Sequence, residues 1–467
     1  MSEIKQETGN DQIITTDLYQ TRDKIYIRRT KGLYRNFRFF GGLFLFAAYF
    51  GVLWLNWDGR QAVLFDLPKR QFHVFEVTFW PQDFVLLSWA LIISAFGLFF
   101  ITVFAGRVWC GYTCPQSVFT WVFMFIEEKT EGKRNARIKL DKQEMNGKKI
   151  LRKAAKHFLW LLVALATAIT FVGYFTPVKQ LIPDLVELNA NGWAIFWIAF
   201  FTLATYGNAG WLREQVCIYM CPYARFQSVM FDRDTLIVSY DTARGENRGA
   251  RKRGIDPKEL NLGDCIDCEL CVQVCPTGID IRDGLQYECI GCAACVDACD
   301  SVMEKMGYEP GLVRYTTENN LEGKTTKILR PRLIGYGTAL TVMICAFSYV
   351  LFSRVPLELD IIRDRGALHQ ITSDGLIENN YLIQIANMTD VDQRFHVEVD
   401  GMDGLKFKTS QEIMVLAESN ATLPTILELP KELNQLPTNK IHFTISSESD
   451  EKLTVTEESR FFGPANF

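Results

Sequence analysis

Residues 265–299 read CIDCELCVQVCPTGIDIRDGLQYECIGCAACVDAC, and this stretch carries eight of the 13 cysteines of the chain. Each half has three cysteines separated by two residues and a fourth cysteine three residues further on. A cubane iron–sulfur cluster needs four thiolates that converge on four irons, and tight loops with two-residue gaps direct three of them together. The fourth ligand of each cluster then comes from the other run. The spacing therefore predicts two [4Fe–4S] clusters in this segment.

The order of the cysteines assigns each of them to a cluster. Zinc is the alternative metal, but zinc sites use paired Cys-x2-Cys knuckles set well apart, so we favour iron–sulfur ligands. The spacing resembles that of a bacterial two-cluster ferredoxin, which implies clusters close enough to exchange electrons. The chain departs from that pattern at Asp300, where proline is common, and this position is not a ligand. One cluster takes Cys265, Cys268, Cys271 and Cys299, and the other takes Cys289, Cys292, Cys295 and Cys275.

Five stretches are long and apolar enough to cross a bilayer, which takes about 20 residues. Buried helices of a soluble protein could explain one such run, but not five. The segment before them, residues 1–36, is polar and lacks the short apolar region of a signal peptide, so we expect the first run to be retained as a membrane anchor. The five predicted spans are residues 37–57, 84–104, 158–175, 193–211 and 333–352.

Lysine and arginine residues in the loops predict the orientation of these spans. Residues 1–38 hold eight and residues 105–156 hold twelve, whereas residues 58–83 hold three and residues 176–192 hold one. The N-terminus and the 105–156 loop are therefore expected in the cytoplasm. Five crossings then place the ferredoxin segment in the cytoplasm and the C-terminal tail outside.

The C-terminal tail has the pattern of a compact β domain. Residues 394–399 alternate between apolar and polar side chains, and residues 440–445 repeat the alternation. The dipeptides Asp400-Gly401 and Asp403-Gly404 mark turns. Short strands over about 110 residues fit a small all-β, immunoglobulin-like sandwich. No catalytic constellation is visible in this tail, so we expect a folded cap or docking module.

The predicted fold is a membrane α-helical bundle of five transmembrane helices with an inserted two-cluster ferredoxin domain and the β-sandwich at its end. The formal net charge of −4 gives no support for nucleic-acid binding. The expected parts are an N-terminal segment (1–36), four helices (37–213), the ferredoxin region (214–331), the fifth helix (332–353) and the β domain (354–467).

Two further cysteine pairs share the pattern Cys-x3-Cys-Pro: Cys110 with Cys114, and Cys217 with Cys221. Each pair follows a predicted span that ends at the cytoplasmic face. A spacing of four residues puts both sulfurs of a pair on one side of a helical turn, and the proline that follows limits continuation of the helix. If the second and fourth spans pack side by side, the four thiols converge at one depth.

Several interpretations of these two pairs stay open. They could be small buried cysteines at helix ends, or each pair could form a disulfide, which the reducing cytoplasm opposes. A third iron–sulfur cluster or a zinc ion on the four cysteines is a further alternative. We favour a soft-metal site, because thiolates supported by the thioether of Met220 select Cu(I). Cys345, alone in the last apolar run, is expected to be a packed apolar residue.

The stretch GRVWCGYTCP at residues 106–115, the second Cys-x3-Cys-Pro motif, the double ferredoxin motif and the five spans follow in that order. Together they resemble the cytochrome c oxidase accessory protein family of the CcoG/FixG/RdxA type over nearly the whole chain. In part they also resemble membrane ferredoxins of nitrate and nitrous oxide reduction. The resemblance implies a multi-pass protein of the bacterial inner membrane, with the ferredoxin domain cytoplasmic and the β domain periplasmic.

The same resemblance implies an oxidoreductase, namely a cupric reductase that helps to assemble the copper centre of a cbb-type oxidase. Cys110, Cys114, Cys217 and Cys221 would then be the catalytic, copper-binding residues. An unidentified electron donor, a copper carrier or chaperone and oxidase assembly factors are the expected partners, with the cysteine pairs meeting within one chain or across a homodimer. Three rival functions are a quinol-linked electron conduit to a partner enzyme, a non-enzymatic assembly scaffold and a thiol–disulfide oxidoreductase.

Overall fold

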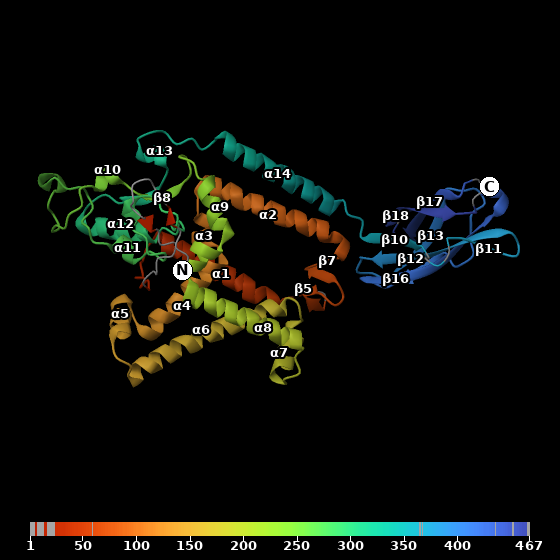
Figure 1. Cartoon of the computed structure of the whole chain (residues 1–467), viewed down its shortest axis with the longest axis horizontal. Helices are drawn as coiled ribbons and strands as arrows, with labels where there is room; N and C mark the ends of the chain where they lie inside the picture. The colour runs from red at the N-terminus through yellow and green to blue at the C-terminus, as the bar shows by residue number, and fades with distance from the viewer. Residues whose placement is uncertain are drawn as a thin grey trace. The chain divides into compact units, whose positions relative to one another are not determined.

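The computed structural model describes residues 5–6, 14–15, 24–57, 59–363, 366, 368–434, 436–450 and 453–464. The chain forms two compact units (Figure 1). The first contains Met1–Glu76 and Leu87–Met343, and the second contains Val77–Leu86 and Ile344–Phe467. Among the described residues, five helices are long and apolar enough to cross a membrane. The predicted helical bundle of a multi-pass membrane protein is therefore confirmed.

Most of the spans begin and end near the predicted residues. The third span is the exception: its helix begins at Gly147, well before the predicted start, because the basic residues that precede the apolar run are themselves helical. Asn146 caps this helix by accepting a hydrogen bond from the backbone N–H of Lys149. The spans are α1 (Leu33–Gly51) with η1 (Val52–Trp54), α2 (Phe84–Ala105), α6 (Gly147–Gly173), α8 (Gly192–Thr205) with η3 (Tyr206–Leu212), and α14 (Pro331–Phe352).

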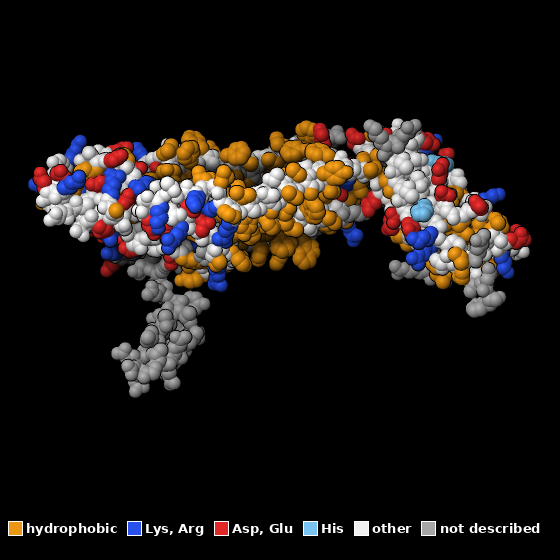
Figure 2. Space-filling model, turned by 90° about the horizontal axis from the view of Figure 1, so that it is seen from above, with side chains coloured by type: hydrophobic (Ala, Val, Ile, Leu, Met, Phe, Trp, Pro, Cys, Tyr) orange, Lys and Arg blue, Asp and Glu red, His pale blue; other side chains and the backbone are white. Residues whose placement is uncertain are grey.

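Helix α8 packs mainly against α6. From the sequence, side-by-side packing of the second and fourth spans was the arrangement that would bring the four thiols together. Small residues such as Ala168 and Ala194 are buried where the two helices meet, together with Leu181 of α7 (Val178–Val186). The outward faces of the spans carry exposed apolar side chains, as lipid contact requires (Figure 2). Cys345 is exposed on α14, little of which is buried. The prediction that Cys345 packs inside the protein was therefore wrong.

Short elements connect the spans of the first unit. Pro115 and Pro222 occupy the first positions of α4 and α9, so each proline starts a helix after its cysteine pair. Between the first two spans lie β3 (Asn56–Trp57), β4 (Arg60–Gln61), β5 (Val63–Asp66), β6 (Gln71–Val74), β7 (Val77–Phe79) and η2 (Pro81–Asp83). The later connections contain α3 (Val108–Tyr112), α4 (Pro115–Glu131), α5 (Arg134–Lys142), η4 (Val216–Met220) and α9 (Pro222–Met230).

The ferredoxin region is built around one strand pair and two helices. Strands β8 (Ile237–Tyr240) and β9 (Val313–Thr316) pair antiparallel, and they pack with α11 (Leu270–Gln273) and α12 (Ala294–Met306). Cys265 and Cys271 belong to this buried core. The remaining short helices are α10 (Thr242–Gly245), η5 (Pro257–Leu260), η6 (Ile281–Asp283) and α13 (Glu318–Leu321).

The second unit is a sandwich of two antiparallel sheets, ordered β10-β12-β16-β14, with β11 on β12, and β15-β13-β17-β18. Phe395, Val397, Ile441, Phe443 and Ile445 are fully buried in its core, which confirms the alternation predicted for residues 394–399 and 440–445. The strands are β10 (Leu357–Arg363), β11 (Gln370–Ile371), β12 (Leu376–Asn387), β13 (Gln393–Asp400), β14 (Lys406–Phe407), β15 (Glu412–Val415), β16 (Ser419–Pro430), β17 (Thr438–Ser447) and β18 (Thr454–Phe462).

Candidate iron–sulfur and thiol site

Four of the eight ferredoxin cysteines gather around the short helix α11. Glu269 precedes this helix with a positive φ of 53°, which folds the chain back between Cys265 and Cys271. The fourth thiol, Cys299, comes from α12. The pKa of Cys299 is raised to about 12, mainly by burial and next by the neighbouring Cys271. Cys265 and Cys268 also raise it. These four thiols are therefore close neighbours.

The other four thiols surround a cavity with about 340 Å³ of open space. Ala293 caps α12 with a positive φ of 53°, and this bend brings cysteines on both sides of it to the same cavity. The remaining lining is mainly apolar, so water is largely excluded. Thiols that surround an apolar space are the setting of a cubane cluster. The cysteines that line the cavity are Cys275, Cys289, Cys292 and Cys295, together with Cys271 of the other predicted set.

The spread of the thiols is of the same kind in both cysteine-rich parts of the chain. Zinc needs its ligands within about 2.3 Å of one centre, whereas a cubane cluster places irons between more widely separated sulfurs. Among the described residues, no three side chains of His, Cys, Asp or Glu converge tightly on one point, neither at the eight ferredoxin cysteines nor at the two Cys-x3-Cys-Pro pairs.

The structure brings the four Cys-x3-Cys-Pro thiols close enough to one another for their charges to interact. Cys110 lies in α3 and Cys114 caps α4, while Cys217 lies in η4 and Cys221 caps α9. Each pair therefore straddles a break between two helices, and the expected single helical turn is interrupted. The pKa of Cys110 is raised to about 11, mainly by burial and next by the neighbouring Cys114. Burial, followed by Cys114 and Cys110, raises the pKa of Cys217 to about 12, so the two motifs are neighbours.

The side chains of Gln227 and Met220 relate differently to these thiols. The Cys110 thiol donates a hydrogen bond to Oε1 of the buried Gln227 at 3.5 Å. Met220 is 61% exposed, so its side chain is not enclosed with the thiols. The structure therefore does not support the expected contribution of its thioether, and the described thiols remain the soft ligands of the site.

The first motif rests directly on the loop that supplies the second set of ferredoxin thiols. A Cβ atom added at Gly111 would lie 2.8 Å from Cα and 3.0 Å from N of Cys292, and 2.9 Å from the carbonyl oxygen of Ile290. Cys110 also packs against the buried apolar cluster that contains Cys292 and Ile290. Only glycine allows this approach, so the backbone of the motif touches the backbone of a predicted cluster ligand.

A buried arginine joins three segments at this junction. Arg107 donates through Nη1 to the carbonyl oxygen of Tyr287 and through Nη2 to that of Ala224 at 2.7 Å. Its guanidinium also lies 4.8 Å from the centre of the Tyr287 ring. Ala224 belongs to α9, and Tyr287 precedes Cys289 by two residues. Arg107 thus ties the first motif to the helix after the second motif and to the ferredoxin loop.

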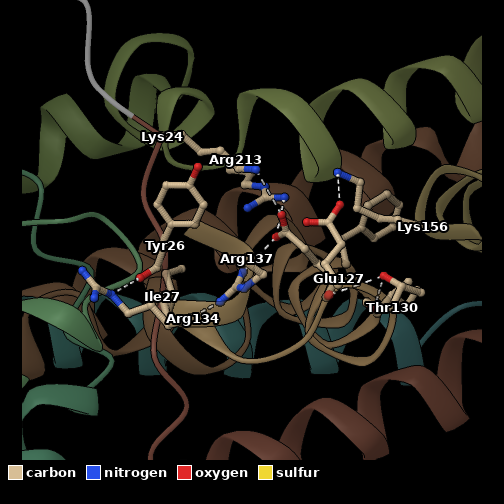
Figure 3. A network of polar contacts seen from close by, with 12 residues as sticks. Lys24, Tyr26, Ile27, Glu127, Thr130, Arg134, Arg137, Lys156 and Arg213 are labelled. Atoms are coloured by element: carbon tan, nitrogen blue, oxygen red, sulfur yellow. Dashed lines mark hydrogen bonds and ion pairs between the residues drawn. The ribbon is translucent and has the colours of Figure 1, made fainter. Parts of the chain in front are cut away.

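A buried carboxylate on α4 provides a second connection (Figure 3). Oε2 of Glu127 lies 3.0 Å from Nη2 of Arg213 and 3.2 Å from Nη1 of Arg137, and Glu127 is fully buried. Burial opposes the charge of Glu127, but Arg213 and Arg137 outweigh it and lower its pKa. Gln116, near the start of α4, donates to the carbonyl oxygen of Arg213 at 3.2 Å. Helix α4 is therefore fastened at two points to the segment that leads into the second motif.

One helical turn later, Glu131 is also fully buried, and it pairs with two lysines of α6. Its Oε1 lies 3.0 Å from Nζ of Lys153 and 2.9 Å from Nζ of Lys156. The Lys156 ammonium lies 4.7 Å from the centre of the Trp160 ring. Sequence reasoning missed this network and the role of Arg107. Two carboxylates one turn apart at the end of a largely apolar helix were the signal that could have indicated it.

Three parts of the chain match known families. Residues 212–318 match the 4Fe–4S dicluster domain, residues 87–130 match a 4Fe–4S binding domain, and residues 347–464 match the immunoglobulin-like fold at the C-terminus of FixG. These matches confirm that the chain contains a dicluster ferredoxin domain and a C-terminal immunoglobulin-like β domain.

Relatives that match most of the chain indicate the same family as the domain matches. The chain is 36% identical to the nitrogen fixation protein FixG of Rhizobium meliloti over 85% of this chain and 83% of that protein. It is 40% identical to the protein RdxB of Cereibacter sphaeroides over 80% of this chain and 81% of that protein. For the protein RdxA of the same species, the identity is 38% over 87% of this chain and 88% of that protein. The chain therefore belongs to the FixG/RdxA/RdxB family of membrane iron–sulfur proteins.

Proposed function

We propose that this protein transfers electrons at the membrane surface and reduces Cu(II) to Cu(I), which then serves to assemble the copper centre of a cbb-type cytochrome c oxidase. The observation that carries the proposal is the seating of Gly111 against Cys292. This contact supports the proposal because the motif of Cys110 and Cys114 rests on the loop that carries the second set of ferredoxin thiols. A soft-metal site at that motif and a one-electron centre in the loop would then be neighbours in one compact unit.

The eight ferredoxin cysteines are the proposed ligands of the two clusters. Cys265, Cys268, Cys271 and Cys299 would hold one [4Fe–4S] cluster, and Cys275, Cys289, Cys292 and Cys295 would hold the other. When bound, the clusters supply one-electron redox chemistry. The apolar lining of the cavity around the second set keeps water away, and Arg107 fixes the distance between that loop and the thiols of the first motif.

Cys110, Cys114, Cys217 and Cys221 would bind copper as the substrate. Each Cu(II) ion takes up one electron and becomes Cu(I), which soft thiolate ligands favour over Cu(II). The two motifs lie on separate short helices, so small movements of α3 and η4 can draw the thiols around the ion. A copper carrier or chaperone would then remove Cu(I). We further propose that the ferredoxin region and this site face the cytoplasm and that the β domain lies in the periplasm.

Anaerobic stopped-flow tests the proposal on the purified, chemically reduced protein mixed with limiting Cu(II). Bleaching of the iron–sulfur absorption is followed together with capture of Cu(I) by a chromogenic chelator. The test variant replaces Cys110, Cys114, Cys217 and Cys221 with serine, and the matched control is Cys345→Ser, which removes the one lone cysteine.

The proposal predicts that the wild type and Cys345→Ser produce Cu(I) as their clusters are oxidised. The fourfold serine variant should keep its clusters but react much more slowly. If all three proteins react equally, copper is reduced adventitiously at exposed clusters. A role as an electron conduit to a partner enzyme then explains the fold better.

A further inference from the structure

Three hollows on the first unit adjoin in a row, each sharing lining residues with the next, and we call them together the basic groove. Its inner end lies between α1 and α4 and reaches Cys217. Its middle part shares Arg38, Trp121 and Met124 with the inner end. Its mouth is lined by the chain from residue 27 to residue 36 and by the start of α5, and it encloses about 1510 Å³ including solvent-filled space.

The inner wall of the basic groove is also a wall of the cavity that would hold the second cluster. Pro276, Thr277 and Ile290 line both the inner hollow and that cavity. Pro276 and Ala294 line both the middle hollow and the cavity. The inner and middle parts of the groove are therefore separated from the space between these thiols by the shared lining residues. The mouth adjoins the middle part through Arg28, Arg29 and Arg137, so a partner seated at the mouth lies at the outer end of a short path to these thiols.

The mouth of the basic groove is strongly positive. Glu128 is the single acidic residue among the described residues that line it, and it lies 4.0 Å from Arg29. Arg28, Lys31 and Lys133 are exposed, and none of them forms an ion pair with any described residue. Arg134 donates to the backbone of Tyr26 and stays at the rim (Figure 3). The rim thus presents several cations whose charge is not neutralised within the described chain.

Deeper in the groove, the cation Arg38 lines both the inner and the middle hollow. Its Nε atom is buried and has no hydrogen-bond partner among the described residues. A cationic groove of this kind repels free Cu(II) and attracts an anionic partner. Copper must then reach the thiols by another route, and the groove is available to the electron donor.

We propose that the mouth of the basic groove docks a negatively charged, low-potential electron-carrier protein, which is the electron donor. In each encounter the carrier is oxidised by one electron and the centre held by Cys275, Cys289, Cys292 and Cys295 is reduced by one, with no bond made or broken. Complementary charge speeds such encounters, and redox partners use small, transient interfaces. This inference rests on the proposed electron-transfer function.

The test uses the full-length protein in nanodiscs of zwitterionic lipid and a strongly acidic plant-type [2Fe–2S] ferredoxin as the probe. The test variant is Arg28→Glu/Lys31→Glu/Lys133→Glu. The matched control is Lys139→Glu/Lys142→Glu/Lys148→Glu, three exposed cations on α5 and at the start of α6 that do not line the groove. Binding of the oxidised ferredoxin is measured by interferometry, so the readout does not depend on turnover. Its rate of electron delivery is measured separately.

We expect the test variant to bind at least about ten-fold more weakly than the control at about 50 mM salt, with the difference vanishing near 500 mM as charges are screened. Delivery of electrons from reduced ferredoxin should fall in parallel, while reduction by the small cation methyl viologen radical should not fall. Equal binding by the two variants overturns the inference. So does a test variant that loses affinity only for vesicles of anionic phosphatidylglycerol, since the groove is then a lipid headgroup site.

The two proposals fail in distinguishable ways. If chemically reduced protein passes electrons to Cu(II) but ferredoxin binds both variants alike, only the docking inference falls. If chemically reduced protein passes no electrons to Cu(II), the proposed cupric reductase function falls whatever the ferredoxin does.

Discussion

Replacing Gly111 with alanine tests whether the first Cys-x3-Cys-Pro motif must rest on the ferredoxin loop. The added Cβ would meet three backbone atoms of Ile290 and Cys292 at 2.8, 2.9 and 3.0 Å. Backbone atoms cannot move aside by a rotamer change, so α3 and the loop must separate. The closest approach is about 0.6 Å shorter than the 3.4 Å at which ordinary contact begins.

Overpacking of this kind costs about 1–3 kcal/mol. We expect the upper part of that range, because all three contacts are with backbone and the hydrogen bond from Arg107 to Tyr287 holds α3 and the loop together. Separation should also move the thiols of Cys110 and Cys114 away from Cys292. The variant should therefore unfold at lower denaturant concentration and reduce Cu(II) more slowly, even in molecules that keep their full iron content.

The assay compares Gly111→Ala with Gly207→Ala, because a Cβ at Gly207 meets nothing within 4 Å. Iron content, denaturant unfolding and single-turnover Cu(II) reduction are measured on both variants and on the wild type. The control should match the wild type in all three. If Gly111→Ala also matches it, the contact between the motif and the ferredoxin loop has no energetic or functional weight, and the reasoning fails.

Three further predictions concern the charge network, the β domain and the topology. Glu127→Gln should destabilise the protein by about 3–5 kcal/mol at neutral pH, since Arg213 and Arg137 lose their buried partner, whereas Glu128→Gln should have little effect. The pKa of Glu127 is lowered in the folded state, so its contribution is full above its unfolded pKa and disappears as the pH falls through the folded value. Unfolding midpoints of the wild type and Glu127→Gln should therefore converge in acid, and a constant gap would contradict the argument. Phe443→Ala should cost the β domain about 3–5 kcal/mol, because the ring is fully buried, and faster hydrogen exchange in β13, β17 and β18 of the intact protein would show it. Alkaline phosphatase fused to the C-terminus should be active and the same enzyme fused within residues 324–329 inactive, while the reverse result would invert the proposed topology.

Much of the fold was predictable because its signals are local. Apolar runs of about 20 residues identify membrane helices without knowledge of their neighbours. Alternation over residues 394–399 and 440–445 likewise predicts strands whose apolar side chains, such as Phe395 and Ile441, are fully buried. The two-residue gaps between cysteines describe loops that turn within four residues. In each case the physical cause and the sequence pattern lie in the same short segment.

The features that sequence reasoning missed depend on contacts between distant segments. Nothing local says that α8 packs most closely on α6 or that Cys345 is exposed on α14. The meeting of Gly111 with Cys292 joins residues far apart in the chain, and a glycine between two cysteines has many explanations. Met220 was misjudged for a related reason, since neighbouring residues in a helix face different directions and spacing alone did not place its side chain.

The buried charged residues were the hardest features to predict from the sequence. Arg107, Glu127 and Glu131 are charged residues that would normally be assigned to a solvated surface, yet all three are buried. Their burial is tolerated because each has partners from other segments: two carbonyl oxygens for Arg107, two arginines for Glu127 and two lysines for Glu131. These partners cannot be read from any one stretch of sequence.

X-ray absorption at the copper edge tests the central claim most directly, on reduced protein that has received one equivalent of Cu(II) without oxygen. We expect a Cu(I) edge with sulfur neighbours only, a protein that still holds about eight irons per chain, and loss of the sulfur shell when Cys110, Cys114, Cys217 and Cys221 are changed to serine. Copper that stays Cu(II), or that binds nitrogen and oxygen alone, would contradict it. So would a preparation with about twelve irons per chain, because the four thiols would then hold a third cluster instead of copper.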